Sequence, residues 1–417
     1  MDALPRLTAA EAAARLGVKP ESLYAYVSRG LLSRERGASG STFDPLEVEA
    51  FARGRRRAPA SRSTDGASAS GLPLGVLETD IAQVEDDTLF FRGRDAVRLA
   101  RESDLESVAA WLWGLPDAAA LRRLGDDPDA VAAARALVRA LPTGATLLDR
   151  MQAAVTALAA SDPLRRDACG PALARAGARL LSGIPRALAD APVPDPVDTA
   201  ADVPRAPADT AATLWTALAG RAPEPAEHRA ISAALVLTVD HDLAVSTLAA
   251  RVAASARGSG YAAVTAALGA FDGPLHGSAS RAAAELLARV RDGEPVDRAL
   301  ASAVRDSGRG VPGFGHPLYA GIDPRAAALL PLVARMPGAG PVAAAVDAVI
   351  AEVERRAGVH PNLDLALGAL VVVGALPPDA GSLVFATGRL TGWIAHAIAE
   401  YEEPPMRLRP RGRYVGP

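Results

Sequence analysis

The chain has 417 residues, of which 49% are hydrophobic and only 4% aromatic. A chain of this length is expected to divide into two or three domains. Its net charge of −3 excludes a protein whose whole surface attracts nucleic acid, so any DNA-binding face must be local. Alanine is very abundant and loses no side-chain entropy in a helix, so the composition favours a mainly helical fold.

Cysteine content and hydropathy indicate a cytoplasmic protein. The one cysteine, Cys169, excludes a disulfide within the chain and fits a reducing compartment. The first residues have no basic stretch followed by an apolar core, so no signal peptide is expected. The longest apolar run, residues 365–376, is shorter than the roughly 20 residues that a membrane span needs.

Residues 1–54 carry the signals of a small domain. Thr8 and Glu11 have the spacing of a capping box, which predicts the start of a helix that Gly17 should end. Pro20 suits the first turn of a second helix.

The second helix should bury one face and expose the other. Leu23, Val27 and Leu31 recur every four residues and predict its buried face, and Gly30 is expected to stop it. The turn-rich segment 34–43 could form a short β-wing, and residues 45–51 should form a third helix.

Two short helices with a tight turn have the spacing of a helix-turn-helix. The segments LTAAEAAARLGV and SLYAYVSRGLL resemble the MerR-like family of winged helix-turn-helix domains. The resemblance implies a second helix that enters the major groove of DNA, with these candidate contacts: Ser22, Tyr24, Tyr26, Ser28 and Arg29. Residues 1–62 hold eleven Lys or Arg and seven Asp or Glu, a modest balance of +4. Protein contacts without DNA therefore remain an equal alternative.

Two segments lack the periodicity of helices. Residues 55–73 are rich in Ser, Ala and Gly, which predicts a flexible linker. Residues 188–208 are rich in Pro, Asp and Ala and should form a surface loop. Most of the chain after residue 100 is predicted to form helices rich in Ala and Leu, which Gly and Pro separate from one another.

Candidate acid–base residues lie in segments rich in glycine, acid or proline. His241 lies in TVDHDLAVST, His276 in GPLHGSAS and His316 in GVPGFGHPLYAGIDPR. Asp364, in HPNLDLALG, stands between leucines, and burial would raise its pKa. A carboxylate beside two imidazoles is a reasonable acid–base set. Spacing alone cannot bring these residues together, and a histidine beside glycine is more often structural.

The order of the motifs carries more information than any one of them. The chain holds DHDLAVSTLAAR, GPLHG, GFGHPLY with DPR, HPNLD, GRLTGWIAH and RPRGRYVG, in that order, after an earlier LFFRGRDAVRLA. They resemble the successive motifs of the citrate synthase family. The resemblance covers about residues 74–417 and implies a helical enzyme with a large domain, residues 74–276 and 373–417. A small domain, residues 277–372, would close over it.

The resemblance implies a role for each candidate. Asp364 would be the base that removes a methyl proton from acetyl-CoA, and His276 would hydrogen-bond the thioester oxygen as the enol forms. His316 would polarise the ketone of oxaloacetate and act as general acid. Citryl-CoA would then be hydrolysed to citrate and CoA. The CoA thioester is a substrate, and neither a bound cofactor nor a metal is expected.

The same resemblance implies two binding sets. The ligands of oxaloacetate and citrate would be His241, Arg325, Arg389 and Arg409. Guanidinium forks suit a dicarboxylate, and Arg409 would reach into the site of the partner in a homodimer. The path of CoA would be lined by Gly310, Val311, Gly313, Phe314 and Gly315.

Departures from the family leave the substrate open. Asp242 and Ala244 stand where the family has Glu and Asn, which puts the choice of oxo acid in doubt. One alternative is a 2-methylcitrate synthase that uses propionyl-CoA, since one methyl group changes binding by only about 1–3 kcal/mol. A second is a DNA-binding regulator that senses CoA esters or oxaloacetate. A third is an N-terminal module that organises oligomers or partners.

Overall fold

The computed structural model describes residues 5–37, 40–57, 77–167, 169–189, 209–273, 276–277, 279–307, 310–409, 414 and 416, without the side chains of residues 55–57. Most of the predicted linker and of the predicted loop at residues 188–208 lies outside these ranges. Within them, no helix combines the length and apolar character that crossing a membrane requires.

The N-terminal residues form a small module of helices around a sheet. Its elements are β1 Leu7–Thr8, α1 Ala9–Leu16, α2 Pro20–Ser28, β2 Glu35–Gly37, β3 Gly40–Phe43 and α3 Pro45–Arg57. The predicted capping box is present, since Thr8 Oγ1 accepts from the Glu11 N–H and the Glu11 carboxylate accepts from the Thr8 N–H. Gly17 ends α1 in the left-handed region, with φ of 63°. The sheet is antiparallel in the order β1-β3-β2, and β2 and β3 form a short hairpin in the segment where the sequence suggested a β-wing.

Two details of the module differ from the prediction. Helix α2 ends at Ser28, and the chain then turns at Gly30, so the four-residue period no longer applies. Leu31 is consequently 49% exposed, whereas Leu32 is buried. Helix α3 continues to Arg57 and so includes residues that the sequence assigned to the linker.

A second sheet was not expected from the sequence. Its strands β4 Ala82–Glu85, β5 Thr88–Phe91 and β6 Arg94–Asp95 form an antiparallel meander. Asp86 and Asp87 make the tight turn between β4 and β5, both with positive φ. This turn reaches the functional site described below.

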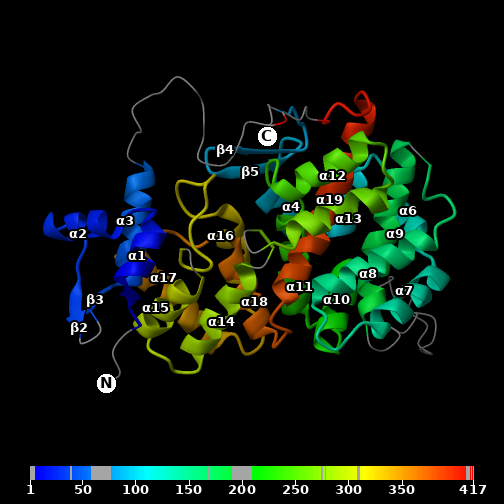
Figure 1. Ribbon diagram of the computed structural model, residues 1–417. Coiled ribbons are helices and arrows are strands. Elements are labelled where there is room, and N and C mark those ends of the chain that lie inside the picture. The colour runs from blue at the N-terminus through cyan, green and yellow to red at the C-terminus, as the bar shows by residue number, and fades with distance from the viewer. Residues whose placement is uncertain are drawn as a thin grey trace.

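Sixteen helices follow within the described residues, as the motifs implied. They are α4 Ala96–Glu102, α5 Leu105–Leu112, α6 Ala118–Gly125, α7 Pro128–Ala140, α8 Leu147–Ala160, α9 Gly170–Leu188, α10 Thr210–Ala219, α11 Pro225–Leu237, α12 Val245–Ser255, α13 Gly260–Phe271, α14 Ala279–Arg291, α15 Val296–Ser307, α16 Pro324–Val333, α17 Gly340–Ala357, α18 Leu363–Val373 and α19 Ala380–Glu402. Figure 1 shows the module at one end of the molecule beside α15 and α17, and α6, α7 and α9 at the other end.

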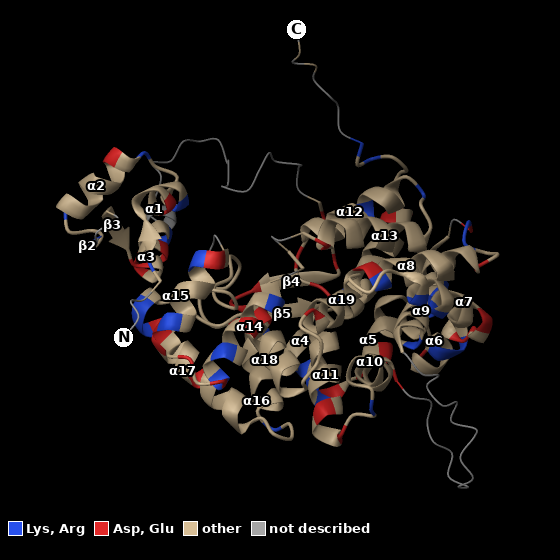
Figure 2. Ribbon diagram, turned by 60° about the horizontal axis from the view of Figure 1, so that its bottom comes forward, with Lys and Arg blue, Asp and Glu red and all other residues tan. Residues whose placement is uncertain are grey.

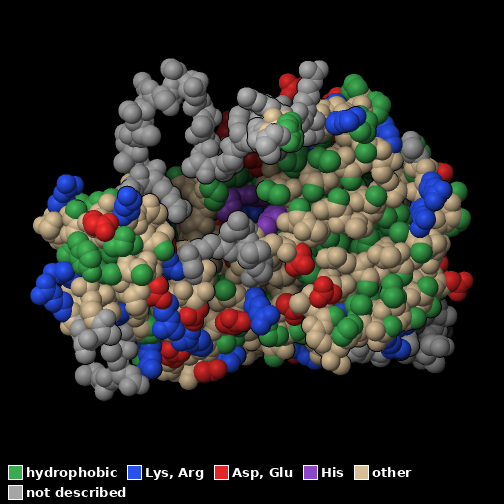
Figure 3. Space-filling view, viewed as in Figure 1, with side chains coloured by type: hydrophobic (Ala, Val, Ile, Leu, Met, Phe, Trp, Pro, Cys, Tyr) green, Lys and Arg blue, Asp and Glu red, His purple; other side chains and the backbone are tan. Residues whose placement is uncertain are grey.

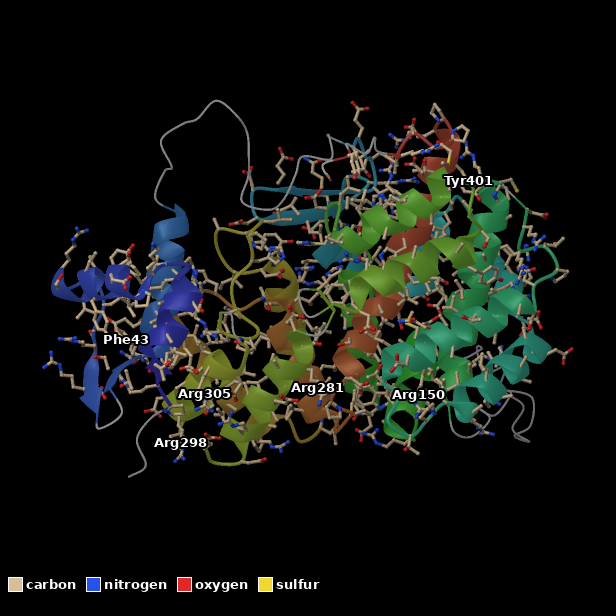
Figure 4. The ribbon with its side chains drawn as sticks, viewed as in Figure 1. Phe43, Arg150, Arg281, Arg298, Arg305 and Tyr401 are labelled. Atoms are coloured by element: carbon tan, nitrogen blue, oxygen red, sulfur yellow. The ribbon has the colours of Figure 1, made fainter. Side chains whose placement is uncertain are left out.

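Helix α19 forms the centre of the larger helical body. It is buried along most of its length and packs against α8, α9, α11, α12 and α13. Gly388 and Gly392 allow close approach to the end of α11, because a Cβ at either position would collide with backbone carbonyls there. Near the other end of α19, the hydroxyl of Tyr401 donates to the carbonyl of Gly258 (Figure 4).

The described residues form two hydrophobic cores that meet at α3. Val48 belongs to the smaller core of the module, together with Leu23 and Phe43. Leu46 belongs to the large core of the helical body. Helix α3 packs on α15 and α17, and Figure 4 shows labelled residues of α15, such as Arg305, beside the module. The module is therefore docked on the helical body through a helix that both cores share.

Candidate active site

Two loops bring His241 and His316 together. His241 follows α11, and His316 lies in the connection between α15 and α16. Their rings meet edge to face, with centroids 4.6 Å apart. The hydroxyl of Tyr319 is hydrogen-bonded to Nε2 of His241 at 2.7 Å, and its ring lies 5.0 Å from that of His316. Residues 75 positions apart in the chain thus form one aromatic cluster.

The surroundings of His316 keep its imidazole neutral and orient it. Burial, together with the Arg325 guanidinium, lowers the pKa of His316 to about 4. The backbone N–H of Leu318 donates to Nδ1 of His316 at 3.1 Å. The ring proton is therefore on Nε2, which makes that atom a hydrogen-bond donor at neutral pH. Burial and the nearby arginines also lower the pKa of His241.

His276 is held by a hydroxyl that the sequence reasoning did not single out. Oγ of Ser246, in the first turn of α12, lies 2.7 Å from Nε2 of His276. The indole N–H of Trp393 donates to the same Oγ at 3.3 Å, which leaves the hydroxyl hydrogen for the imidazole. This arrangement favours the tautomer with its proton on Nδ1. Burial, with a smaller effect from Arg389, lowers the pKa of His276 to about 4.

Asp364 lies in the first turn of α18, where it is partly buried. The side chain of Asn362 caps the helix by accepting from the Asp364 N–H at 3.0 Å. Burial raises the pKa of Asp364 to about 6, against the opposing effect of Arg325. Such a carboxyl group is a stronger base than an ordinary aspartate and is still mostly ionised at pH 7.

Asn362 also ties the loop that precedes His316 to the loop that precedes Asp364. Its side-chain N–H donates to the carbonyl of Gly315 at 2.9 Å, and its backbone N–H donates to that of Gly313 at 2.9 Å. Gly313 has a φ of 81° and packs directly on Leu365, where a side chain would not fit. The two segments that carry candidate catalytic groups are therefore joined as one unit.

The two buried arginines differ in their partners. Arg325 makes a two-pronged ion pair with Asp323, at 2.8 and 3.0 Å, and Asp323 also accepts from the Leu363 N–H. Arg389 donates from Nε to the carbonyl of Thr238, but its buried Nη1 has no hydrogen-bond partner within the described part of the chain. Burial lowers the pKa of Arg389 to about 10, despite the nearby carboxylate of Asp240. A buried guanidinium with an unused donor is suited to an anionic ligand.

A second buried pair fixes the segment that carries His241. Asp240 precedes His241, and its carboxylate accepts from Nε2 of His396 on α19 at 2.7 Å, with both side chains fully buried. Both residues lie inside quoted motifs, yet sequence spacing gave no sign that they pair.

The remaining predicted site residues do not all line the cleft. Gly310, Phe314 and Gly315 line the cleft, whereas Val311 is buried and Gly313 faces Leu365. Arg409 is exposed beyond α19, and no contact of the described residues joins it to the histidine cluster. Ala244 occupies the N-cap of α12 and supplies no side-chain acceptor there.

An open cleft of about 1180 Å³ leads to this cluster. His316, Tyr319 and Gly315 line it, together with the turn between β4 and β5. The carboxylate of Asp87 in that turn accepts from the N–H groups of Ala320 and Gly321, which holds the loop after His316. Figure 3 shows histidine side chains at the bottom of a hollow between the two halves of the molecule. Among the described residues, no group of three or more His, Cys, Asp or Glu could hold a metal ion.

Comparisons with known proteins match most of the chain to one family. The family model described as citrate synthase, C-terminal domain, matches residues 71–411. The chain is 30% identical over 296 residues to the citrate synthase of Thermoplasma acidophilum, covering 67% of this chain and 74% of that enzyme. It is 29% identical over 348 residues to 2-methylcitrate synthase 2 of Corynebacterium glutamicum. That match covers 80% of this chain and 90% of that enzyme.

The structural comparison agrees with the sequence comparison. The solved citrate synthase of Thermoplasma acidophilum, in a ternary complex with carboxymethyl coenzyme A and oxaloacetate, matches with a TM-score of 0.67 and 26% identity. The match covers 83% of this chain and 95% of that one.

Proposed function

Because the chain belongs to the citrate synthase family, we propose that it condenses acetyl-CoA with oxaloacetate and hydrolyses citryl-CoA to citrate and CoA. The observation that carries the proposal is a basic carboxylate and neutral imidazoles around two buried arginines: Arg325 acts on the pKa of Asp364 and of His316, and Arg389 acts on that of His276. Burial raises the pKa of Asp364 to about 6 and lowers those of His276 and His316 to about 4. At neutral pH the site therefore holds one proton acceptor and two uncharged donors.

The first step is formation of the enol of acetyl-CoA. Asp364 takes a proton from the methyl group, and the electrons of the C–H bond move toward the thioester oxygen. Negative charge that develops on this oxygen needs a positioned donor. We assign this role to the Nδ1–H of His276, because the contact with Ser246 favours that tautomer.

The second step joins carbon to carbon. The enol carbon attacks the ketone carbon of oxaloacetate, and Nε2–H of His316 protonates the oxygen that becomes the hydroxyl of citryl-CoA. Arg389 supplies an unused buried donor for a carboxylate of oxaloacetate, with His241 and Arg325 beside it. Water then attacks the thioester carbon, and CoA leaves as the thiol.

The dimer and domain closure are part of the same proposal. Val245 and Val252 are exposed on one face of α12, at 68% and 46%, and Met406 is bound to the end of this helix. This apolar strip supports a homodimer in which Arg409 enters the partner's site. The small domain, residues 277–372, would close over the large domain, residues 74–276 and 373–417, to exclude water from the condensation.

The experiment that tests the proposal is thiol release from acetyl-CoA and from propionyl-CoA, each with and without oxaloacetate. Release that depends on oxaloacetate supports the condensation, and a preference for propionyl-CoA would make the enzyme a 2-methylcitrate synthase. The relative in Corynebacterium glutamicum supports that alternative. No release from either donor by the folded protein would reject both.

The pH dependence of kcat/KM is expected to follow a single ionisation. Asp364 acts as a base only when deprotonated, so kcat/KM should rise as pH increases through about 6 and level off above about 7. His276 and His316 stay neutral over this range, because burial lowers their pKa values to about 4. Initial rates between pH 5 and 8, at roughly constant ionic strength, measure the profile; a flat profile would count against Asp364 as the base.

A second function, binding of DNA, is proposed for residues 1–54. The order β1-α1-α2-β2-β3-α3 supports a winged helix-turn-helix of the MerR-like type. Tyr24 is 40% exposed on α2, near the Arg34 guanidinium, and Ser28 and Arg29 are exposed after it. Tyr26 differs from the predicted outward face, because α2 turns its ring onto Phe51 in the module core. Figure 2 shows charges of both signs on the module.

A gel-shift titration with DNA from upstream of the protein's own gene tests this function. We expect a complex that weakens as salt increases and that Arg29→Gln weakens further. Arg281→Gln on α14 is the control, because that arginine is exposed on the helical body. The absence of salt-sensitive binding, with or without CoA esters, would leave the module with a role in protein contacts alone.

A further inference from the structure

One wall of the substrate cleft comes from the N-terminal module. Glu49, Ala52 and Arg53 of α3 line the same cleft as His316 and Gly315. The citrate synthase family match begins at residue 71, so this wall lies outside the family portion of the chain. The cleft is thus lined by two parts of the protein that the sequence analysis predicted as separate domains.

Helix α3 is fixed at this wall by three kinds of contact. Leu46 is buried in the large core. Asp44 forms an ion pair with Arg356 near the end of α17. One N–H of the Arg53 guanidinium donates to the carbonyl of Ala357, the last residue of α17, at 3.1 Å. The Arg53 side chain is therefore held at the cleft by the body against which the module docks.

Charge within the cleft singles out Arg53. Among the described residues that line the cleft, it is the one arginine, and none is a lysine. Three acidic residues also line the cleft: Asp86 is exposed, the carboxylate of Asp87 accepts from two backbone N–H groups, and Glu49 lies 3.4 Å from the guanidinium of Arg15. A guanidinium presents several N–H donors in a planar fork that matches phosphate oxygens.

The size of the cleft fits a long ligand with its reacting group at one end. Pockets for drug-sized ligands have about 300–1,000 Å³, whereas this cleft measures about 1180 Å³. A CoA thioester carries its acyl group at one end and its phosphates at the other. With the acyl group near His316, the phosphates must lie elsewhere along the cleft.

We propose that Arg53 binds a phosphate of the CoA nucleotide, so that the N-terminal module completes the acyl-CoA site. The inference rests on the proposed function, because it takes the thioester as the substrate. It adds that α3, a helix outside the family portion of the chain, recognises the part of that substrate farthest from the chemistry.

The test compares Arg53→Gln and Arg53→Lys with wild type on three acyl donors. These are acetyl-CoA, acetyl-dephospho-CoA, which lacks the 3′-phosphate, and acetyl-pantetheine, which lacks all phosphates. We expect Arg53→Gln to raise KM for acetyl-CoA about tenfold or more, with little change in kcat or in KM for oxaloacetate. Arg53→Lys keeps the charge without the fork and should have a smaller effect. The control is Arg36→Gln, at an exposed position of β2 outside the cleft lining.

The pattern across donors separates recognition from mere structural support. A KM increase for acetyl-CoA alone identifies the 3′-phosphate, and an increase for both nucleotide donors identifies the pyrophosphate. An equal increase for acetyl-pantetheine would overturn the proposal, because it would show only that α3 had shifted. An unchanged KM for acetyl-CoA would overturn it as well. Failure of the wild type to release thiol from any donor would instead refute the proposed function.

Discussion

Replacing Asp364 by asparagine is expected to lower kcat for thiol release by about 10²–10⁴-fold. The asparagine amide has nearly the same shape but cannot accept a proton from the methyl group of the thioester. KM for oxaloacetate should change little, because Asp364 lies on α18 and the proposed contacts to oxaloacetate come from other elements. Rates at saturating acetyl-CoA and oxaloacetate measure the effect.

The same substitution should also stabilise the folded protein at neutral pH. Burial raises the pKa of Asp364 in the folded state from 3.8 to about 6, so the folded state binds this proton more tightly than the unfolded state. The stability that this proton contributes is complete below the unfolded pKa and is lost as pH rises through about 6. Asparagine avoids the cost of the buried charge, and the melting temperature at pH 7 should rise by about 2 °C.

The control for this pair of measurements is Asp347→Asn. Asp347 is an exposed residue of α17, and its replacement should change neither the rate nor the melting temperature. An inactive Asp364→Asn protein with a lower melting temperature would indicate damage to the fold instead of loss of a base. Full activity in Asp364→Asn would exclude Asp364 from the chemistry.

Replacing Arg389 by glutamine is expected to raise KM for oxaloacetate by about 10²–10³-fold. Its buried Nη1 has no hydrogen-bond partner among the described residues, so the positive charge is available to a carboxylate of the substrate. Glutamine retains an N–H group that can replace the donor to the Thr238 carbonyl. Initial rates against oxaloacetate concentration, at fixed acetyl-CoA, give the value.

Arg325→Gln provides the matched comparison. Arg325 is already paired with Asp323, whose carboxylate also holds the start of α18. Removing Arg325 leaves that buried carboxylate without its cation, so a lower melting temperature should accompany any change in KM. If Arg389→Gln raised KM for acetyl-CoA and left KM for oxaloacetate unchanged, the assignment of Arg389 to the dicarboxylate would be wrong.

Local signals in the sequence predicted helix ends better than they predicted packing. The capping box at Thr8 and the stop at Gly17 both follow from backbone chemistry within a few residues, and both are confirmed. The prediction that Leu31 is buried was wrong, because the four-residue period was extended past a helix that ends at Ser28. The sheet β4–β6 was missed because its strands have only two to four residues, too few to show alternation.

The candidate site shows a similar limit. Motif order indicated His276, His316 and Asp364 as a set, but their roles stay predictions. The partners that orient them, Ser246 and Asn362, were overlooked even though they lie inside the quoted motifs. Hydroxyl and amide side chains occur throughout any sequence, and only the folded arrangement reveals which of them face an imidazole or a loop.

Helix α3 limits how this protein can change over evolutionary time. Within a few residues it presents Val48 to the module core, Leu46 to the large core and Ala52 to the cleft. A substitution on any of these three sides therefore changes a contact with a different neighbour. Fewer residue types are compatible with the helix as a result. Exchange of the module for another by recombination would succeed only if the incoming helix matched α15, α17 and the cleft together. Helix α3 thus places the module, the helical body and the cleft under one shared set of packing constraints.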